Sequence, residues 1–506
     1  MTKAILAAAL TLITLAAVPA RADIPGTNQV HIESGPLVGV RTDNIVAFKG
    51  VPFAAPPVGR LRWKPPQAVV KWRGVRDASR FGAICPQTPN FATPKDAVQS
   101  EDCLTLNVWA PAASAKPAPV MVWIHGGGDV NGTASEPQFD GAVFAKNGIV
   151  FVSIEYRLGL LGWLAHPALT AEAGPNAPLA NYGLMDQIAA LQWVNRNIAA
   201  FGGDPSRVTI AGESAGGEAV ISLMTVPAAR GLFSQAIVES GGGWYLGSSL
   251  AYEEKLGLAR LQKAGAAAGS DTTALRTLPV AALVAAEEDD IGTVIDGRLV
   301  KAGPARVFER GQAAPVPLLI GSNSGEDNLL GESPAADVLK DFTAEQLAAL
   351  RKAYGEPAAS DDTALAHAIF RDQFMGAPAR WIAVHQSAKA PTYLYYFDYV
   401  PQIIRGRMLK AHHGVEMLFS FAAMTRGPRP IHIISGADSA EMTLVHGCWA
   451  SFVKTGAPNC AGWPAYSPAG DQLLDFSDQA SVRTGFNKAA YDILDGIEQK
   501  QLTGAR

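Results

Sequence analysis

The chain has 506 residues, of which 48% are hydrophobic and 17% charged, so it is long enough to bury a large core. Its 42 Lys and Arg residues nearly balance its 46 Asp and Glu residues, which gives a net charge of -4. Because there is no basic block and no acidic tail, this balance argues against nucleic acid as a partner. We expect one domain over residues 23–506, since large α/β enzymes of this length often form a single unit with insertions.

The N-terminus has the pattern of a cleaved signal peptide over residues 1–22. Lys3 precedes a mostly apolar run at residues 4–18, and the small-residue segment Ala20-Arg21-Ala22 follows it. The run is shorter than the roughly 20 apolar residues that span a bilayer, which disfavours a membrane anchor. We expect the mature protein to be exported, to the periplasm or the medium, with no membrane attachment after cleavage.

Short extended pieces broken by prolines occupy residues 27–110 and predict a small antiparallel sheet near the N-terminus. Beyond them, short apolar runs alternate with helical patterns. The runs cover residues 120–124, 150–154, 208–211, 236–238, 317–320 and 393–397. Such runs are typical of strands that are covered on both faces. The alternation predicts an α/β fold with a mostly parallel sheet.

The four cysteines form two pairs of sequence neighbours. Cys85 and Cys103 bracket a loop rich in Pro, Thr and Asp, while Cys448 and Cys460 lie on either side of a predicted helix end. Neighbour pairing is the simplest connectivity in an oxidising compartment, and closing such a loop stabilises by about 3 kcal/mol in the chain-entropy model. Four buried thiols are the alternative. His446 lies close to Cys448, but no further ligands cluster there, so we expect no metal site.

A serine in a glycine-rich turn follows the strand predicted at residues 208–211. The segment Gly212-Glu213-Ser214-Ala215-Gly216-Gly217 leads from this strand into a helix-prone stretch, and the chain has no second Gly-x-Ser-x-Gly pattern. The flanking glycines allow the tight strand-to-helix turn that exposes a nucleophilic hydroxyl. Ser214 is therefore the predicted nucleophile.

A serine nucleophile needs a base and a carboxylate that orients the base. In α/β-hydrolases the acid follows the serine along the chain and the histidine follows the acid. The strand predicted at residues 317–320 leads into a loop that contains Glu326 and Asp327. Both carboxylates are candidates for the acid.

Chain order excludes His31, His125 and His166 as the base. The segment His412-His413-Gly414 fits a loop in which an imidazole can reach the serine, and spacing does not distinguish the two histidines. We expect structural roles for the other histidines, which are His367, His385, His432 and His446.

The strand predicted at residues 120–124 ends in His125-Gly126-Gly127-Gly128, where consecutive glycines leave the backbone amides uncovered. Together with the amide of Ala215, those of Gly127 and Gly128 are expected to donate to the oxygen that becomes negative as an ester carbonyl turns tetrahedral. A plain flexible turn and a phosphate-binding loop are the alternatives, but the Gly-Lys-Ser/Thr segment of a phosphate-binding loop does not follow.

With these motifs the chain resembles the type-B carboxylesterase family, which includes the cholinesterases and the bacterial para-nitrobenzyl esterases. The resemblance extends over nearly the whole mature chain. It is carried by residues 48–54, 101–104, 123–128, 156–159, 197–204, 212–217 and 413–414. It implies the α/β-hydrolase fold, in which helices flank a mostly parallel sheet, a small antiparallel sheet lies at the N-terminus, and helical insertions form a gorge.

The resemblance also assigns residues that spacing leaves open. It implies Ser214 as the nucleophile, Glu326 rather than Asp327 as the acid, and His413 rather than His412 as the base. It implies an oxyanion hole at Gly127, Gly128 and Ala215, a disulfide between Cys85 and Cys103, and supporting roles for Glu213 and Ser240 in a polar network behind the triad.

Two residues depart from the family pattern. Asp129 follows the glycine run, where the family usually has an aromatic or apolar residue, and Glu155 replaces the usual Asn before Tyr156-Arg157. A carboxylate aimed at the oxyanion would oppose the negative charge that develops there. We therefore expect Asp129 to point away, to be paired, or to face a cationic or polyhydroxylated substrate.

Two further features concern the substrate pocket. The loop at residues 86–102 has Phe91 as its only aromatic residue, whereas cholinesterases hold a quaternary ammonium against a Trp in this loop, so choline esters are disfavoured. Trp244 is a candidate wall of the acyl pocket, and a position in the core is the alternative.

These features predict a serine hydrolase that cleaves small-molecule carboxylic esters through an acyl-enzyme intermediate and needs no cofactor. A specialised esterase that acts on a bulky ester, a polymer fragment or a toxin ester is the closest alternative. A non-catalytic, cholinesterase-like binding protein is an alternative from another class, although such relatives typically lack part of the triad. The sequence does not predict the oligomeric state.

Overall fold

The computed structural model describes residues 28–113, 116–244, 247–287, 291–427 and 429–503. The signal peptide predicted at residues 1–22 lies outside this part of the chain. Within it, no helix combines the length and the apolar character that crossing a bilayer requires.

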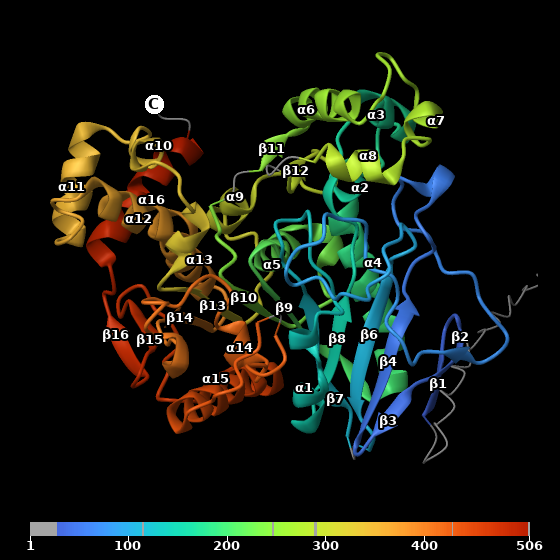
Figure 1. The fold of residues 1–506 in the computed structure, drawn as a ribbon, viewed down its shortest axis with the longest axis horizontal. Helices are drawn as coiled ribbons and strands as arrows, with labels where there is room; N and C mark the ends of the chain where they lie inside the picture. Colours follow the sequence, from blue (N-terminus) through green and yellow to red (C-terminus); the bar gives the residue numbers. More distant parts are fainter. Residues whose placement is uncertain (1–27, 114–115, 245–246, 288–290, 428, 504–506) are drawn as a thin grey trace, which may run out of the picture.

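A central sheet runs through the molecule (Figure 1), and in the described residues it has 11 strands in the order β16-β15-β14-β13-β10-β9-β7-β8-β6-β4-β3. Their bounds are β3 Val40–Thr42, β4 Ile45–Pro52, β6 Thr105–Pro111, β7 Ala118–Ile124, β8 Val150–Ile154, β9 Gly203–Glu213, β10 Gln235–Glu239, β13 Leu318–Asn323, β14 Thr392–Phe397, β15 Gln472–Phe476 and β16 Ser481–Thr484. The strands from β8 through β7, β9, β10, β13 and β14 to β15 pair in parallel. All six apolar runs of the sequence lie in this parallel part, so the prediction of a mostly parallel α/β sheet is confirmed.

The N-terminal region differs in part from the expected separate antiparallel sheet. A small sheet does form, from β1 (Gln29–Ile32), β2 (Gly35–Val38) and β5 (Arg76–Asp77), but β5 pairs with β2 in parallel. The strands β3, β4 and β6 instead extend the central sheet with antiparallel pairs. A further short sheet joins β11 (Ser248–Ser249) to β12 (Val294–Ile295).

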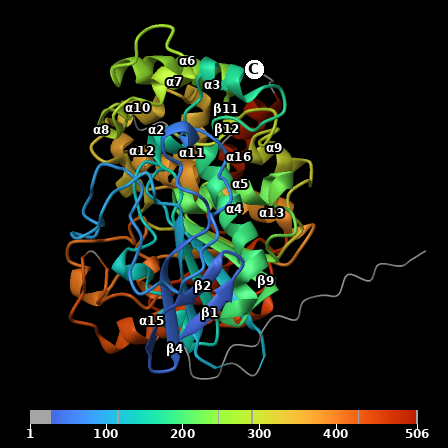
Figure 2. The same ribbon diagram turned by 90° about the vertical axis from the view of Figure 1, so that its right-hand side faces the viewer.

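Helices surround this sheet in both views (Figures 1 and 2). Their bounds are α1 Ala142–Lys146, α2 Gly159–Gly162, α3 Pro167–Ala173, α4 Tyr182–Asn197, α5 Ala215–Thr225, α6 Leu250–Lys263, α7 Thr272–Leu275, α8 Val280–Ala285, α9 Pro304–Glu309, α10 Ala335–Leu339, α11 Ala344–Tyr354, α12 Asp362–Arg371, α13 Ala377–Ser387, α14 Met417–Ser420, α15 Gly436–Thr455 and α16 Lys488–Thr503. The helices α3, α6 and α7 gather beyond one end of the sheet, at the top of both views.

The alternation of side chains along each strand creates a separate core on each face of the sheet. In β7, Val120 and Val122 belong to a core shared with α4, α5 and α13, whereas Met121 and Trp123 belong to a core shared with α1, α14 and α15. Because both faces are covered, the central strands are mostly apolar, which is why they appear in the sequence as short apolar runs.

Candidate active site

Ser214 occupies the turn between β9 and α5 in a conformation that L residues rarely adopt. Its φ is 57°, and a strained backbone of this kind costs about 1–3 kcal/mol. The surroundings hold it in place, because the Ser214 amide donates to the carbonyl of Glu239 at 2.9 Å and the Ser214 carbonyl accepts from the amide of Glu218 at 2.9 Å. The turn therefore presents the serine side chain at the end of the parallel strands.

Glycines around this turn are required by close backbone contacts. A Cβ atom on Gly216 would lie 2.1 Å from the carbonyl oxygen of Ile124 in β7, and one on Gly126 would lie 2.5 Å from the carbonyl oxygen of Glu213 and 3.0 Å from Cβ of Ser214. The glycine loop after β7 and the serine turn thus touch each other, as the sequence motifs predict.

Glu326 and His413 form a close pair from two neighbouring loops. Glu326 follows β13 and is completely buried, and its Oε2 lies 2.6 Å from Nδ1 of His413. Its other oxygen, Oε1, accepts from the hydroxyl of Ser240 at 2.6 Å and from the amide of Asn323 at 2.8 Å. The carboxylate is therefore fixed in orientation against the imidazole.

Hydrogen bonds join the two loops that carry this pair. The amide of Gly325 donates to the carbonyl of Ala411 at 2.8 Å, and the amide of His413 itself donates to Oδ1 of Asn328 at 2.8 Å. The side-chain amide of Asn323 also donates to the carbonyl of His412 at 3.0 Å. These contacts set the acid and the histidine as one unit.

Asp327 and His412, the alternatives to Glu326 and His413, make other contacts. Asp327 lies 3.0 Å from Nδ1 of His367 and 3.2 Å from Nζ of Lys410. His412 contributes its backbone carbonyl to the loop contacts rather than its ring.

The second ring nitrogen of His413 faces Glu213. Nε2 lies 3.2 Å from Oε1 of Glu213 and, among the described residues, has no hydrogen-bond partner. Thus the structure contains no hydrogen bond between Nε2 and Ser214, although the serine follows Glu213 directly. Catalytic hydrogen bonds are often long before substrate binds and shorten in the complex.

Buried carboxylates control the charge of this site. Burial alone would lower the pKa of His413, but Glu213 and Glu326 together raise it above its usual value. Burial raises the pKa of Glu213, an effect that the charge of His413 opposes. Glu239 and Glu416 are two further buried carboxylates that interact electrostatically with Glu213. Burial raises the pKa of Glu239 to about 8 and raises the pKa of Glu416 well above its usual range.

The predicted oxyanion amides lie free around the serine turn. Within the described residues, the N–H groups of Gly127, Gly128 and Ala215 have no backbone acceptor. Gly127 and Gly128 have φ values of 104° and 63°, which glycine adopts without strain. Amides left free in this way are available to an external acceptor.

The two departures from the family pattern occupy different environments. Glu155 accepts from the hydroxyl of Thr133 at 2.5 Å and from the amide of Ala134 at 3.0 Å, so it is a buried structural carboxylate. Burial nevertheless raises its pKa to about 8. Asp129 is also buried, and its Oδ1 has no hydrogen-bond partner among the described residues, so of the three alternatives for this residue pairing is not seen for that oxygen.

Trp244 is buried and packs in the core that contains α5 and α13. It does not belong to the residues that line the cavity around Asp129. Its proposed place in the acyl pocket stays a prediction.

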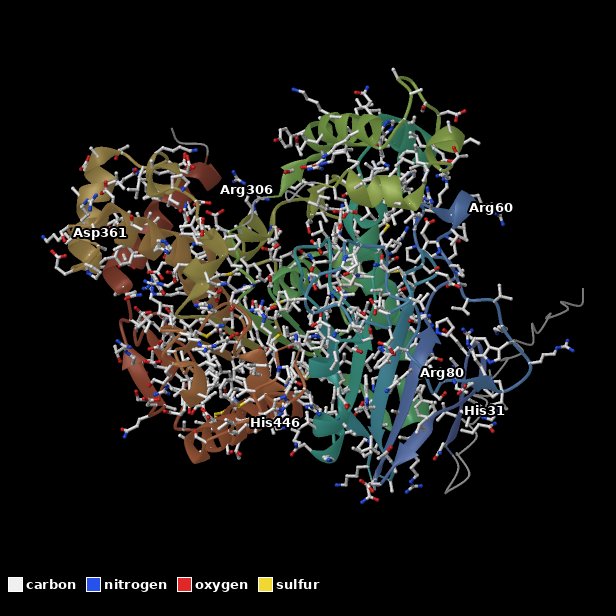
Figure 3. The ribbon with its side chains drawn as sticks, in the orientation of Figure 1. His31, Arg60, Arg80, Arg306, Asp361 and His446 are labelled. Carbon is white, nitrogen blue, oxygen red and sulfur yellow. A yellow bond between two sulfur atoms is a disulfide. The ribbon has the colours of Figure 1, made fainter. Side chains whose placement is uncertain are left out.

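The remaining predictions concern histidines and cysteines outside the site. His446 lies on α15 (Figure 3), where its Nδ1 is 2.8 Å from the carbonyl oxygen of Ser420, which fits the expected structural role. The neighbour pairing of the cysteines is confirmed, because Cys85–Cys103 and Cys448–Cys460 form disulfides.

Three acidic residues of this region were missed by the sequence analysis. They are Glu218 in the first turn of α5, Glu239 at the end of β10, and Glu136, whose pKa burial raises to about 8. Glu239 could have been detected from the sequence, because it is a charged residue at the end of an apolar strand.

The fold agrees with comparisons to known proteins. Residues 26–494 match the model of the Carboxylesterase family. The chain is 34% identical over 487 residues to the fumonisin B1 esterase of Sphingopyxis macrogoltabida, covering 90% of this chain and 87% of the relative. It is 35% identical over 484 residues to the para-nitrobenzyl esterase of Bacillus subtilis (strain 168), covering 90% of this chain and 95% of the relative.

Solved structures give the same result. A para-nitrobenzyl (PNB) esterase superposes with a TM-score of 0.81 at 31% identity, over 92% of this chain and 99% of the other. A carboxylesterase of Geobacillus stearothermophilus superposes with a TM-score of 0.80 at 33% identity, over 92% and 100%. The chain therefore belongs to the carboxylesterase family and has the α/β-hydrolase fold.

Proposed function

We propose that this protein hydrolyses small-molecule carboxylic esters with Ser214 as nucleophile, His413 as base and Glu326 as the orienting acid. The observation that carries the assignment is the 2.6 Å contact between Nδ1 of His413 and Oε2 of Glu326, next to the serine turn. The other ring nitrogen has no hydrogen-bond partner among the described residues, and in the neutral form of the ring it can take the serine proton. Because catalytic hydrogen bonds often form only in the substrate complex, we expect Nε2 and the Ser214 hydroxyl to meet when substrate binds.

The reaction has two acyl-transfer steps. His413 removes the proton of Ser214 as the hydroxyl attacks the ester carbonyl, and it then protonates the departing alcohol. Glu326 stabilises the imidazolium, and the amides of Gly127, Gly128 and Ala215 stabilise the oxyanion. Water then attacks the acyl-enzyme with the same base, which releases the carboxylic acid.

Glu213 and Ser240 act as positioning residues in this scheme. Ser240 fixes the carboxylate of Glu326 by donating to Oε1 at 2.6 Å. Glu213 places a second carboxylate 3.2 Å from Nε2 of His413, where it favours the protonated ring.

Export to the periplasm or the medium completes the proposal. The two disulfides fit an oxidising compartment, in agreement with the signal peptide predicted at residues 1–22.

The test is covalent labelling together with mutagenesis. A fluorophosphonate reagent should modify Ser214, as identified by peptide mass spectrometry, and S214A should lower kcat for p-nitrophenyl butyrate by about 10⁴-fold or more. S206A is the matched control, because Ser206 is an exposed serine on the same strand β9. Labelling of another residue, or full activity of S214A, would overturn the assignment, and the absence of any labelling and hydrolysis would favour the binding-protein alternative.

A further inference from the structure

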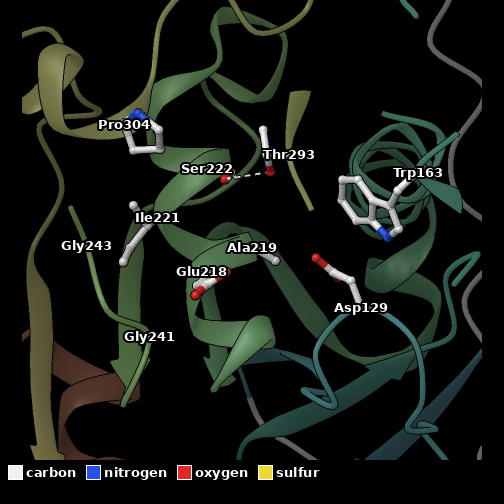
Figure 4. A pocket seen from close by; sticks show the side chains of 10 residues that line it. All are labelled: Asp129, Trp163, Glu218, Ala219, Ile221, Ser222, Gly241, Gly243, Thr293 and Pro304. Atoms are coloured by element: carbon white, nitrogen blue, oxygen red, sulfur yellow. Dashed lines mark hydrogen bonds between the residues drawn. The ribbon is translucent and has the colours of Figure 1, made fainter. Parts of the chain in front are cut away.

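A small cavity lies between helix α5 and the loops that follow β7 and β10. Asp129, Trp163, Glu218, Ser222 and Thr293 are among the residues that line it (Figure 4). Its volume is about 10 Å³. A cavity of this size holds one group as large as a water molecule.

The carboxylate of Asp129 is buried at this cavity. The residue is 6% exposed, and its Oδ1 accepts no hydrogen bond from the described residues. Its backbone has a φ of 59°, and its carbonyl accepts from the amide of Gly159 at 2.7 Å, so the loop holds the residue in place. Figure 4 shows the carboxylate pointing from this loop toward α5. Because an unpaired buried carboxylate is costly, the site calls for a ligand that donates to it.

Glu218 brings a second carboxylate to the same cavity. It lies one helical turn after Ser214 in α5. Burial raises the pKa of Glu218 to about 7, although the charge of His413 opposes the rise. Burial also raises the pKa of Asp129, and Glu218 adds to that rise. Among the described lining residues there is no Lys, Arg or His to offset the two acids.

We propose that this cavity binds the primary ammonium group of an ester substrate, with Asp129 and Glu218 as its acceptors. The proposal rests on the proposed function of Ser214, because it assigns the substrate class of that site. Glu218 connects this cavity electrostatically to the proposed base, because the charge of His413 acts on its pKa.

The chemistry of the lining selects a primary ammonium. This group has three N–H donors and nearly the size of a water molecule, so it matches two carboxylates in a cavity of about 10 Å³. The hydroxyls of Ser222 and Thr293, 3.4 Å apart, offer further oxygen acceptors. The indole of Trp163 lines the same space and adds an aromatic surface that attracts cations. A quaternary ammonium is too large and has no N–H to donate.

The bound cation also removes an obstacle to catalysis. Asp129 directly follows the glycine loop that holds the proposed oxyanion amides, so in its ionised form it would oppose the negative charge of the oxyanion. An ammonium paired with Asp129 cancels that charge, so an amine-bearing ester gains in kcat as well as in binding.

The experiment compares esters that differ only in one terminal group. The acyl series pairs p-nitrophenyl 6-aminohexanoate with p-nitrophenyl heptanoate, and the alcohol series pairs 6-aminohexyl butyrate with heptyl butyrate. We expect kcat/KM for the amine to exceed that of its neutral partner by about tenfold or more in one series. A ratio near one in both series would overturn the ammonium site. The trimethylammonium analogue should show no such preference, and an equal preference would show general charge attraction instead.

Substitutions then locate the effect. D129N and E218Q should each bring the amine-to-neutral ratio toward one. E345Q is the matched control, because Glu345 is also in the first turn of a helix, α11, but is exposed and away from the cavity, and its ratio should stay as in the wild type. Unchanged ratios in both cavity variants would overturn the assignment.

An inhibition measurement needs no variant. The n-hexylammonium ion should inhibit hydrolysis of p-nitrophenyl heptanoate competitively and about tenfold more strongly than n-hexanol, and equal inhibition would overturn the site. The proposed function fails separately: if Ser214 is labelled by the fluorophosphonate and S214A is inactive while the amine preference is absent, only the ammonium site is wrong.

Discussion

Nε2 of His413 lies 3.2 Å from Oε1 of Glu213, the residue that precedes the proposed nucleophile. The imidazole is therefore placed between two carboxylates, since Glu326 contacts its other nitrogen at 2.6 Å. Both negative charges favour the protonated ring, and together they overcome the effect of burial and raise the pKa of His413.

Replacing Glu213 with Gln should lower the pKa of His413. The loss of a negative charge destabilises the imidazolium, so the neutral base persists to lower pH and the acid limb of the kcat/KM profile moves to lower pH. On the plateau, kcat should fall by about tenfold, because the imidazolium formed in the transition state loses stabilisation. A pH profile of p-nitrophenyl butyrate hydrolysis measures both effects.

The control for this profile is D327N. Asp327 follows Glu326 directly in the chain, but its carboxylate contacts Lys410 and His367. The acid limb of the D327N profile should coincide with that of the wild type. An E213Q limb that moves to higher pH, or not at all, would contradict the electrostatic role of Glu213.

Gly126→Ala should lower kcat by about 100-fold, because the new methyl group must push the glycine loop away from the serine turn. Its Cβ would lie 2.5 Å from the carbonyl oxygen of Glu213. Gly447→Ala is the matched control: a Cβ there meets nothing within 4 Å, and its place inside α15 predicts a gain of about 0.5–1 kcal/mol in the free energy of unfolding. Steady-state kinetics and thermal melts distinguish the two results, and a G126A enzyme with normal kcat would show that the loop adapts.

Asp186→Ala should lower the free energy of unfolding by about 3–5 kcal/mol, because it leaves the Arg157 guanidinium buried without its counter-ion. The two residues form a bidentate pair with distances of 2.7 and 2.8 Å, and Asp186 is completely buried. Urea unfolding measures the change. At the exposed pair between Arg405 and Asp478, D478A should cost less than about 1 kcal/mol, and equal losses at both pairs would contradict the dependence on burial.

Removing the disulfide between Cys85 and Cys103 by a double change to Ala should cost about 3 kcal/mol in urea unfolding. The two residues are 18 positions apart, whereas Cys448 and Cys460 are 12 apart. In the chain-entropy model the second disulfide should contribute about 0.4 kcal/mol less than the first. A larger loss from the shorter loop would show that loop entropy is not the main source of the stabilisation.

The centre of the sheet could be predicted from the sequence because its strands are buried on both faces. The runs at β7, β8, β9, β10, β13 and β14 are mostly apolar, so each can be recognised as a strand without knowing which strand it pairs with. The edge strands could not be predicted in the same way. Whether β4 and β6 join the central sheet or a separate one depends on pairing between distant segments, and β4 pairs with β6 across more than 50 residues.

The serine turn and the glycine loop were likewise predictable, because their glycines satisfy local steric demands. The choice between Glu326 and Asp327 was not, since adjacent side chains point in different directions and the direction depends on contacts such as that of Asn328 with His413. Family resemblance indicated Glu326, and Glu326 is the carboxylate that lies 2.6 Å from Nδ1 of His413. The cavity at Asp129 and Glu218 was beyond sequence reasoning, because 89 positions separate these two residues in the chain.

The dipeptide Glu239–Ser240 connects the two halves of the proposed catalytic machinery. The carbonyl of Glu239 holds the amide of Ser214, while the hydroxyl of Ser240 holds Glu326. Alignment of the reacting groups is thus maintained from within the sheet and independently of the helices α3, α6 and α7 beyond its end. Evolution or protein engineering can therefore change these outer helices to accept other substrates while the arrangement of the catalytic groups is kept.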